Sequence, residues 1–363
     1  MGIDAASITA AGLTLLEAML DEERPGWAQD MGLVSRAQSL SLGFTEEQRS
    51  LTPAAKDDVP YAYLAYFAPR TLAAVSASLG GGPVPERIID LGAGTGALSL
   101  AFALAGTAHL TLIDHDPHAL EVARRLLARV PGKIQIETHC TTVETATPWH
   151  HETTVASAFT LGELATHDDG GAHWQLLLRT APSANRFFLV DAGDYRRARR
   201  LQELRKAALE AGWHVAAPCP HEEPCPALER ARDWCHLRAP RRLTERLGLF
   251  AAATGRDPQE MAFSHLDLWR HLDQPAQDGL LVLGEPRKEK GRVRLPVCGA
   301  GGLRYVQALK RDRRAHDGLL SLERGTRLSA LEFREFERRG DTAHLQHWPR
   351  HDDEQSAPPG ECP

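Results

Sequence analysis

The stretch IIDLGAGTGALSL, from Ile88 to Leu100, decides the fold. It opens with a short apolar run that is typical of a buried strand, continues with Gly92, Gly94 and Gly96, and ends in an apolar segment of helical character. Glycine lets the backbone turn tightly and lets a ligand approach it closely, and the amides at a helix N-terminus can bind that ligand. The stretch therefore predicts a strand, a ligand-binding turn and a helix.

Strands and helices alternate along the chain from this point. The predicted strands are 87–91, 109–113, 133–137, 153–159 and 186–190, and the predicted helices between them are 97–105, 117–130 and 174–179. Parallel strands need crossover connections of this kind. The alternation therefore predicts an α/β domain with a parallel sheet over residues 86–216.

Three further regions flank this domain. Residues 1–85 show helical spacing of apolar side chains and predict an N-terminal helical region. Residues 217–345 form a cysteine-rich and basic region, with strand character at 280–283 and 291–297 and a predicted helix at 328–339. Residues 346–363 are acidic and proline-containing, which predicts a disordered tail.

The glycine spacing points to S-adenosylmethionine rather than to a dinucleotide. The pattern is Gly-x-Gly-x-Gly, and Asp90 precedes it, where a carboxylate could hold the cationic methionyl amino group. Asp114 ends the second predicted strand, at the place from which a carboxylate accepts the ribose hydroxyls in this class of fold. We therefore predict Asp90, Gly92, Gly94, Gly96 and Asp114 as cofactor-binding residues. The arrangement resembles the class I methyltransferase fold, which is Rossmann-like.

Catalytic residues are harder to identify. Methylation of base amino groups usually accompanies an (Asn/Asp)-Pro-Pro-aromatic motif after the fourth strand, and here that place is occupied by Thr160 to Leu164. Glu163 is a weak candidate for a general base or an orienting carboxylate. A carboxylate at a helix start more often caps the helix, so Glu163 is only a weak candidate. The sequence identifies no other catalytic residue.

Cysteines cluster in a proline-rich stretch after the fifth predicted strand. Cys219, Cys225 and Cys235 lie within 17 residues, and Cys298 follows, with the spacing C-x5-C-x9-C-x62-C. Converging thiolates suit a soft-metal site, and four of them could hold either a [4Fe-4S] cluster or zinc. His221 and His236 are alternative ligands or, if all four cysteines bind the metal, candidates to donate hydrogen bonds to the sulfurs.

Composition and charge limit the class of protein. The 363 residues are 42% hydrophobic and 25% charged, which is typical of a globular protein, and the most apolar stretch contains too many polar residues to predict a membrane span. The acidic N-terminus does not resemble a secretory signal, so we expect a cytoplasmic protein. Residues 1–170 carry 10 basic and 21 acidic residues, and residues 171–363 carry 32 and 27. The basic second half suggests a surface that faces a polyanion.

Several motifs together resemble the methyltransferase-like proteins of the small ribosomal subunit, a family of bacteria and mitochondria. The motifs are APCPH at 217–221, CP at 225–226, DWCH at 233–236, GEPRK at 284–288, Gly291 and Cys298. The resemblance covers roughly residues 60–310 and implies a class I methyltransferase fold that acts on or binds the small ribosomal subunit or its rRNA during assembly. It also implies a [4Fe-4S] cluster held by the residues that match Cys219, Cys225, Cys235 and Cys298.

The chain departs from the family pattern in two places. Asp191-Ala192-Gly193 stands where Glu-Pro-Gly is common, and Leu237 stands where an aromatic residue is common. Two functions remain open at this point: methyl transfer to rRNA or a ribosomal protein, or a non-catalytic assembly and RNA-binding role with the cluster, or a zinc ion, as a structural staple. A radical enzyme is a weaker third alternative, since four cysteines leave no open iron. Nothing in the sequence indicates a dimer interface, so we expect a monomer.

Overall fold

The computed structural model describes residues 4–43, 58–79, 83–146, 149, 153–164, 170–240, 242–255, 260–272, 279–329, 336–339 and 342–345. The chain divides into two compact units. The first unit consists of Met1–Pro218 and Ala227–Asp273, and the second of Cys219–Pro226 and Gln274–Pro363. Among the described residues, none of the helices has both the length and the apolar character needed to cross a membrane.

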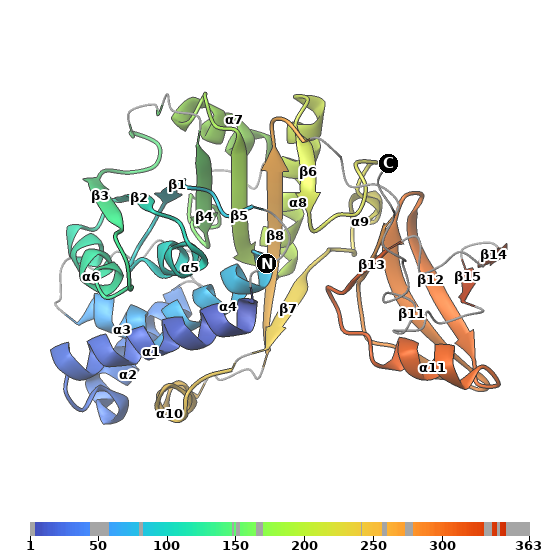
Figure 1. The fold of residues 1–363 in the computed structure, drawn as a ribbon, viewed down its shortest axis with the longest axis horizontal. Coiled ribbons are helices and arrows are strands. Elements are labelled where there is room, and N and C mark those ends of the chain that lie inside the picture. The colour runs from blue at the N-terminus through green and yellow to red at the C-terminus, as the bar shows by residue number, and fades with distance from the viewer. Residues whose placement is uncertain are drawn as a thin grey trace, which may run out of the picture. The chain divides into compact units, whose positions relative to one another are not determined.

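A mixed sheet forms the centre of the first unit (Figure 1). Its spatial order is β3 (Gln135–Cys140), β2 (His109–Asp114), β1 (Arg87–Leu91), β4 (Thr154–Ala158), β5 (Arg186–Ala192), β8 (Glu260–Trp269) and β6 (His214–Ala217), with β7 (Leu237–Pro240) paired to β8. The first five strands are parallel, and β8 is antiparallel to β5, β6 and β7. The C-terminal ends of β1, β2, β4 and β5 therefore lie at one edge.

The described residues before residue 273 also form helices. They are α1 (Ala5–Glu23), η1 (Trp27–Gln29), α2 (Met31–Leu42), α3 (Val59–Tyr66), α4 (Ala68–Ser78), α5 (Ala97–Ala105), α6 (Pro117–Leu127), α7 (Gly170–Thr180), α8 (Tyr195–Glu210), α9 (Pro226–Glu229) and α10 (Glu245–Ala253). Helices α1, α3 and α4 pack on one another (Figure 1), α5 packs on β1, β2 and β4, and α8 packs on β5, β6 and β8. The N-terminal helices are therefore part of the first unit.

The core forms where the sequence is most apolar. Ile88 and Leu91 of β1 are buried, and so is every residue of α5 from Ala97 to Ala103. A helix buried on all sides needs apolar and small residues throughout, which the segment ALSLAFALA supplies. The glycine loop between these two elements is therefore fixed at both ends.

A buried ion pair joins β5 to its antiparallel neighbour β8. Arg186 donates from Nε to Oδ1 of Asp267 over 2.8 Å and from Nη2 to Oδ2 over 2.9 Å. Both side chains are almost completely buried. Two parallel hydrogen bonds satisfy both charges, which are costly to bury unless they are paired.

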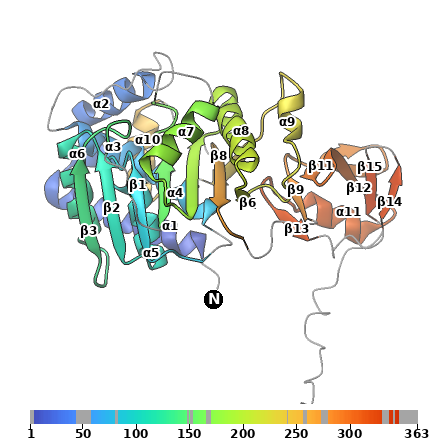
Figure 2. The same cartoon turned by 90° about the horizontal axis from the view of Figure 1, so that it is seen from above.

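The second unit is a smaller sheet with one helix against it. Its strand order is β13 (Arg327–Ser329), β9 (Gly279–Val282), β11 (Arg292–Gly299), β12 (Gly302–Leu309), β15 (Thr342–Leu345) and β14 (Phe336–Arg339), with β10 (Arg287–Glu289) paired to β11. Helix α11 (Arg313–Leu320) packs on β11 and β12 (Figure 2). Val293, Leu295 and Val297 alternate along β11 and are buried with Leu319 of α11. The polar residues of β11 therefore lie on the opposite face of the sheet.

Residues 219–226 belong to this second unit although they are distant in sequence. Glu223 accepts a hydrogen bond from the backbone amide of Gly301 over 2.6 Å. A Cβ atom on Gly279 would lie 3.2 Å from Pro220, so the segment packs closely on β9. The chain leaves the first unit for these eight residues and then returns to it.

Most predicted elements of residues 86–216 are confirmed. All five predicted strands occur as β1 to β5, and the three predicted helices occur as α5, α6 and α7. Strands β6 and β8 were not predicted. Residues 227–269, which we expected in the cysteine-rich region, supply β7, α10 and β8 to the first unit.

The prediction of a helix at 328–339 is wrong for the residues of this segment that the structure describes. Arg327–Ser329 pairs with β9 as strand β13, and Phe336–Arg339 pairs antiparallel with Thr342–Leu345 as strands β14 and β15. The segment has helix-forming residues, but strand pairing with the rest of the sheet overrides this weak local preference. The tail predicted at 346–363 lies outside the described residues.

Candidate functional site

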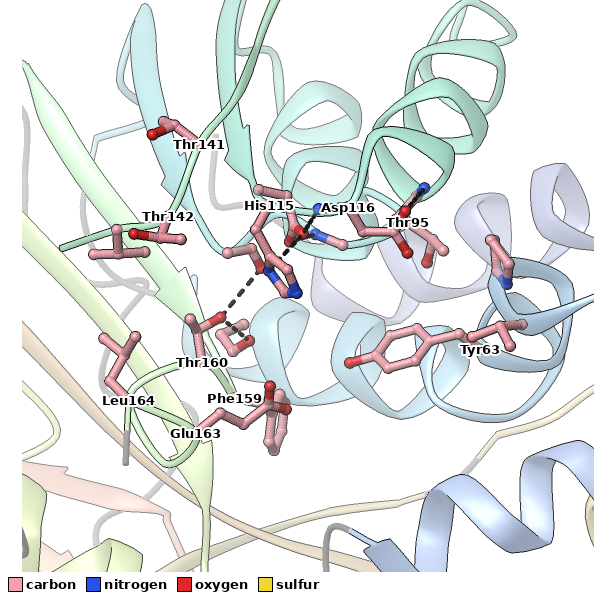
Figure 3. A pocket seen from close by; sticks show the side chains of 18 of the residues that line it. Tyr63, Thr95, His115, Asp116, Thr141, Thr142, Phe159, Thr160, Glu163 and Leu164 are labelled. Atoms are coloured by element: carbon pink, nitrogen blue, oxygen red, sulfur yellow. Dashed lines mark hydrogen bonds and ion pairs between the residues drawn. The ribbon is translucent and has the colours of Figure 1, made fainter. Parts of the chain in front are cut away.

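A cavity of about 330 Å³ lies at the edge where the parallel strands of the first unit end. This volume is within the range of small-molecule sites. Residues of α2, α3, α6 and the glycine loop line it, together with the residues at the end of β2 and just after β3 and β4. Figure 3 shows Tyr63, Thr95, Asp116, Phe159 and Glu163 among them.

The three glycines of the loop all have left-handed backbone conformations. Their φ angles are +71° at Gly92, +51° at Gly94 and +82° at Gly96. A Cβ atom on Gly92 would lie 2.2 Å from Thr160, and one on Gly96 would lie 2.9 Å from Ala123. Glycine is therefore required at both positions for the backbone conformation and for the close packing.

Gly94 has a different environment. The nearest atom to a Cβ at this position would be Cε1 of Tyr63, at 4.0 Å, and Gly94 lines the cavity. Its left-handed backbone thus faces open space, which a ligand could approach closely. This cradle fits the predicted cofactor, because a glycine without a Cβ atom lets a ligand approach the backbone closely.

Asp114 holds the loop from the end of β2. Its Oδ2 accepts a hydrogen bond from the backbone amide of Gly94 over 2.8 Å, and its Oδ1 accepts one from Asp116 over 2.9 Å. Its side chain is 11% exposed and lines the cavity. Each carboxylate oxygen has further lone pairs, so Asp114 can accept hydroxyl donors from a ligand as well.

Two predicted cofactor residues do not line this cavity. Asp90 is fully buried in β1, where its Oδ2 accepts a hydrogen bond from Ser99 over 2.7 Å. Burial raises the pKa of Asp90 to about 7, and its Oδ1 has no hydrogen-bond partner among the described residues. Gly96 packs against α6. Both residues therefore stabilise the conformation of the loop and do not face the cavity.

Glu163 lies in the turn after β4, where its backbone amide donates to the carbonyl of Thr160 over 2.8 Å. It does not cap α7, which begins at Gly170. Burial, together with the negative charges of Asp191 and Asp114, raises the pKa of Glu163 to about 8. At neutral pH the carboxyl group is thus mostly protonated and can donate a hydrogen bond into the cavity.

The sequence did not identify Tyr63 or Phe159 as site residues. Tyr63 is contributed by α3, whose apolar spacing predicts only a packing helix. Phe159 follows β4 with a φ of +63°, which is uncommon for a residue with a bulky side chain. Backbone strain of this kind is often found at functional sites, but it cannot be read from sequence.

The predicted metal ligands are divided between the two units. Cys219, Cys225 and Cys298 belong to the second unit, and Cys235 belongs to the first. In the second unit, Nε2 of His221 lies 3.3 Å from the sulfur of Cys298, and both residues are buried.

Cys235 is held through its backbone, since its carbonyl accepts a hydrogen bond from Ser264 over 3.0 Å. Within the described part of the chain, no group of three or more His, Cys, Asp or Glu side chains is placed to hold a metal ion. The donor chemistry therefore fits a soft metal, but the structure does not show an assembled ligand cage.

Several solved structures resemble this chain. A candidate RNA methyltransferase from Pyrococcus horikoshii is 15% identical, with 66% of this chain and all of that chain covered and a TM-score of 0.35. Magnesium protoporphyrin IX methyltransferase from Synechocystis, with bound S-adenosylmethionine, is 12% identical, with 65% and 97% covered and a TM-score of 0.36. TehB from Haemophilus influenzae is 12% identical, with 51% and 57% covered and a TM-score of 0.33.

No curated protein sequence matches the chain. A family model described as mitochondrial small ribosomal subunit Rsm22 does match, over residues 58–317. The match includes the glycine loop, Asp114, Glu163 and all four clustered cysteines. The chain therefore belongs to the Rsm22 family of the mitochondrial small ribosomal subunit, as its sequence motifs predicted.

Proposed function

We propose that this protein binds S-adenosylmethionine in the first cavity and acts as a methyltransferase on the small ribosomal subunit during its assembly. The observation that carries the proposal is the glycine loop, in which Gly94 faces the cavity in a left-handed conformation while Asp114 holds its amide. Family membership supports the ribosomal context. The cofactor would supply an electrophilic methyl group.

The chain's own residues would bind and orient that cofactor. The backbone at Gly92 and Gly94 would contact it, and Asp114 would accept its ribose hydroxyls. Asp90 and Gly96 would act through the loop that they support, because neither lines the cavity. Glu163 would hold its proton at the cavity wall and donate a hydrogen bond to a ligand group.

RNA is the partner that the second unit favours. Arg287 and Arg294 lie on neighbouring strands, and their guanidinium groups are 5.7 Å and 4.1 Å from the ring centroid of Tyr305. Guanidinium groups bind phosphate, and aromatic rings stack on unpaired bases. We propose that this face contacts rRNA. We expect this contact to weaken as salt concentration rises.

The cysteines carry a separate proposal. We propose that Cys219, Cys225, Cys235 and Cys298 hold a [4Fe-4S] cluster, with zinc as the alternative. The sequence spacing supports this proposal, and so does the short distance from His221 to the sulfur of Cys298. The metal would contribute folding energy and would have no part in methyl transfer.

A second candidate function is a non-catalytic assembly factor. The observation in its favour is the turn after β4, where Thr160 to Leu164 replace the usual base-methylation motif. Under this alternative the same surfaces would bind the small subunit as a monomer without turnover. The cytoplasmic location expected from the N-terminal sequence stays a prediction.

The variant Asp114→Asn tests the cofactor proposal and separates the two functions. We expect it to weaken the binding of S-adenosylhomocysteine, measured by calorimetry, by about 10- to 100-fold, because a hydrogen bond to a charged acceptor contributes roughly 1.5–3 kcal/mol. The control Glu210→Gln changes an exposed carboxylate on α8 and should bind normally. If the wild type bound no S-adenosylhomocysteine, the cofactor proposal would fail.

Co-sedimentation of the same variants with small subunits measures the other function. If the Asp114→Asn protein associates normally with small subunits but cannot support methylation in cells, the protein is an enzyme. Full function of this variant in assembly would instead indicate a non-catalytic factor.

A further inference from the structure

A second cavity of about 400 Å³ adjoins the first in the same unit. Tyr63, Phe159 and Glu163 line both cavities, so they form a shared wall. The remaining lining comes from α2, from α3 and α4, from the end of β5 and the first turn of α8, and from the start of β8. A ligand in this second cavity would therefore lie next to a ligand in the first.

Aromatic rings form one side of the second cavity. The ring centroids of Tyr63 and Phe67 are 4.9 Å apart, and those of Tyr66 and Phe67 are also 4.9 Å apart in an edge-to-face arrangement. The guanidinium of Arg70 lies 3.5 Å from the centre of the Tyr66 ring. These contacts hold the rings in place and present a surface on which a flat ligand can stack.

A buried carboxylate also lines the second cavity. Asp191 is 1% exposed and lines the cavity, and its Oδ1 accepts a hydrogen bond from the amide of Ala192 over 2.8 Å. Its Oδ2 is also buried, and among the described residues it has no hydrogen-bond partner. A buried acceptor without a donor is costly, so a ligand that supplies an N–H group would satisfy it.

We propose that the second cavity binds the methyl acceptor as the flat ring of a nucleobase, whose N–H edge donates to Asp191. The inference rests on the proposed function, since it takes the first cavity as the cofactor site. A nucleobase edge carries both donors and acceptors, and this wall offers both, with carboxyls at Asp191 and Glu163 and a guanidinium at Arg197. Enzymes that modify bases bind the unstacked base in pockets of this kind, between aromatic side chains and hydrogen-bonding groups.

A cationic side chain of a ribosomal protein is the competing acceptor. The ionised carboxylate of Asp191 would attract such a group, but the group would also meet Arg70 and Arg197, which line the same cavity. Like charges at close range disfavour binding. The aromatic side of the cavity also offers more stacking contact to a flat ring than to a flexible side chain. The observations therefore favour the nucleobase.

Nucleoside binding to the full chain tests the inference directly. The ligands are adenosine, cytidine, guanosine and uridine, and saturation-transfer NMR measures their binding with and without saturating S-adenosylhomocysteine. N-acetyl-arginine amide and N-acetyl-lysine amide represent the competing protein acceptor. We expect at least one nucleoside to bind. Asp191→Asn should weaken that binding about tenfold or more, because an amide nitrogen would replace the acceptor.

Two further variants keep the test decisive. Ala262→Phe places a ring into the cavity from an exposed position at the start of β8, so it should block nucleoside binding even if Asp191→Asn folds poorly. Glu210→Gln on α8 is the control and should bind nucleosides like the wild type. Binding of S-adenosylhomocysteine to Ala262→Phe should stay within about twofold of the wild type, because Ala262 does not line the first cavity.

Each outcome separates this inference from the proposed function. Failure of all nucleosides to bind, with normal binding of S-adenosylhomocysteine, overturns the nucleobase assignment alone. Binding of the arginine or lysine probe, blocked by Ala262→Phe, overturns it in favour of a protein acceptor. Nucleoside binding that Asp191→Asn weakens, in a chain that binds no S-adenosylhomocysteine, supports the base site and overturns the cofactor proposal.

Discussion

Each of four neighbouring parallel strands delivers one acidic side chain near its C-terminal end. These residues are Asp114 from β2, Asp90 from β1, Glu163 from the turn after β4, and Asp191 from β5. Burial raises the pKa of Asp90 to about 7, that of Glu163 to about 8 and that of Asp191 to about 6. At neutral pH this edge therefore carries less negative charge than its composition suggests.

The Glu163 carboxyl should make the stability of the first unit depend on pH. Its pKa in the folded protein, about 8, is above its ordinary value of 4.5, so its contribution is fully present below pH 4.5 and is lost as pH rises through 8. Glu163→Gln removes this loss. We expect its stability relative to the wild type to increase between pH 5 and pH 9 by on the order of 1–3 kcal/mol.

Urea denaturation at both pH values measures this difference. Glu210→Gln, which changes an exposed carboxylate, should show no such increase. An equal stability difference at pH 5 and pH 9 for Glu163→Gln would show that the carboxyl ionises normally in the folded protein.

At the scale of single elements, the turn between β1 and α5 requires both glycine backbone freedom and space. Gly96 and Gly212 have nearly the same φ, +82° and +80°. A Cβ on Gly96 would lie 2.9 Å from the Cβ of Ala123 on α6, whereas a Cβ on Gly212 would have no atom within 4 Å. The pair therefore separates backbone strain from crowding.

Gly96→Ala should destabilise the protein more than Gly212→Ala. Both variants force alanine into a left-handed conformation, which costs roughly 1–2 kcal/mol. Gly96→Ala must also push α6 away, and overpacking costs about 1–3 kcal/mol more. Denaturation curves of the two variants measure the difference, and equal losses would mean that α6 moves freely to make room.

Elements were predictable wherever local sequence determines them. The run from Ile88 to Gly96 specifies strand and turn through its own residues, and Asp114 follows from the next strand. By contrast, β8 contains Asp267, which is buried and pairs with Arg186 from β5. Such a partner is distant in sequence, so the burial of Asp267 could not be predicted.

The same reason limits prediction of the site. Gly92, Gly94, Asp114 and Glu163 lie within or beside predicted strands and line the first cavity. Tyr63 reaches it only because α3 packs near the sheet edge, which is a property of tertiary packing. The second cavity requires five separate segments to meet, and no local pattern indicates it.

At the scale of the whole molecule, metal analysis tests whether the four clustered cysteines hold a metal. Protein purified without oxygen should contain about four iron and four sulfide per chain if a [4Fe-4S] cluster is present. Cys219→Ser should then lose the iron and lower the stability of the second unit, because the metal contributes to folding. Cys140→Ser is the control, since Cys140 is exposed on β3 and outside the cluster.

Elemental analysis and sulfide assays distinguish the alternatives. One zinc per chain without sulfide would replace the cluster by a static zinc site. Neither metal, together with unchanged stability of Cys219→Ser, would remove the metal proposal and leave the thiols as packing residues.

The excursion of residues 219–226 has a consequence for how this protein can be dissected. The chain passes between the two units three times, after residues 218, 226 and 273. A deletion that ends the chain at 273 would leave Pro220 and Glu223 without β9 and Gly301, their packing and hydrogen-bonding partners. No single cut yields two intact halves, so a truncation experiment on this protein has to keep residues 219–226 together with the segment after residue 273.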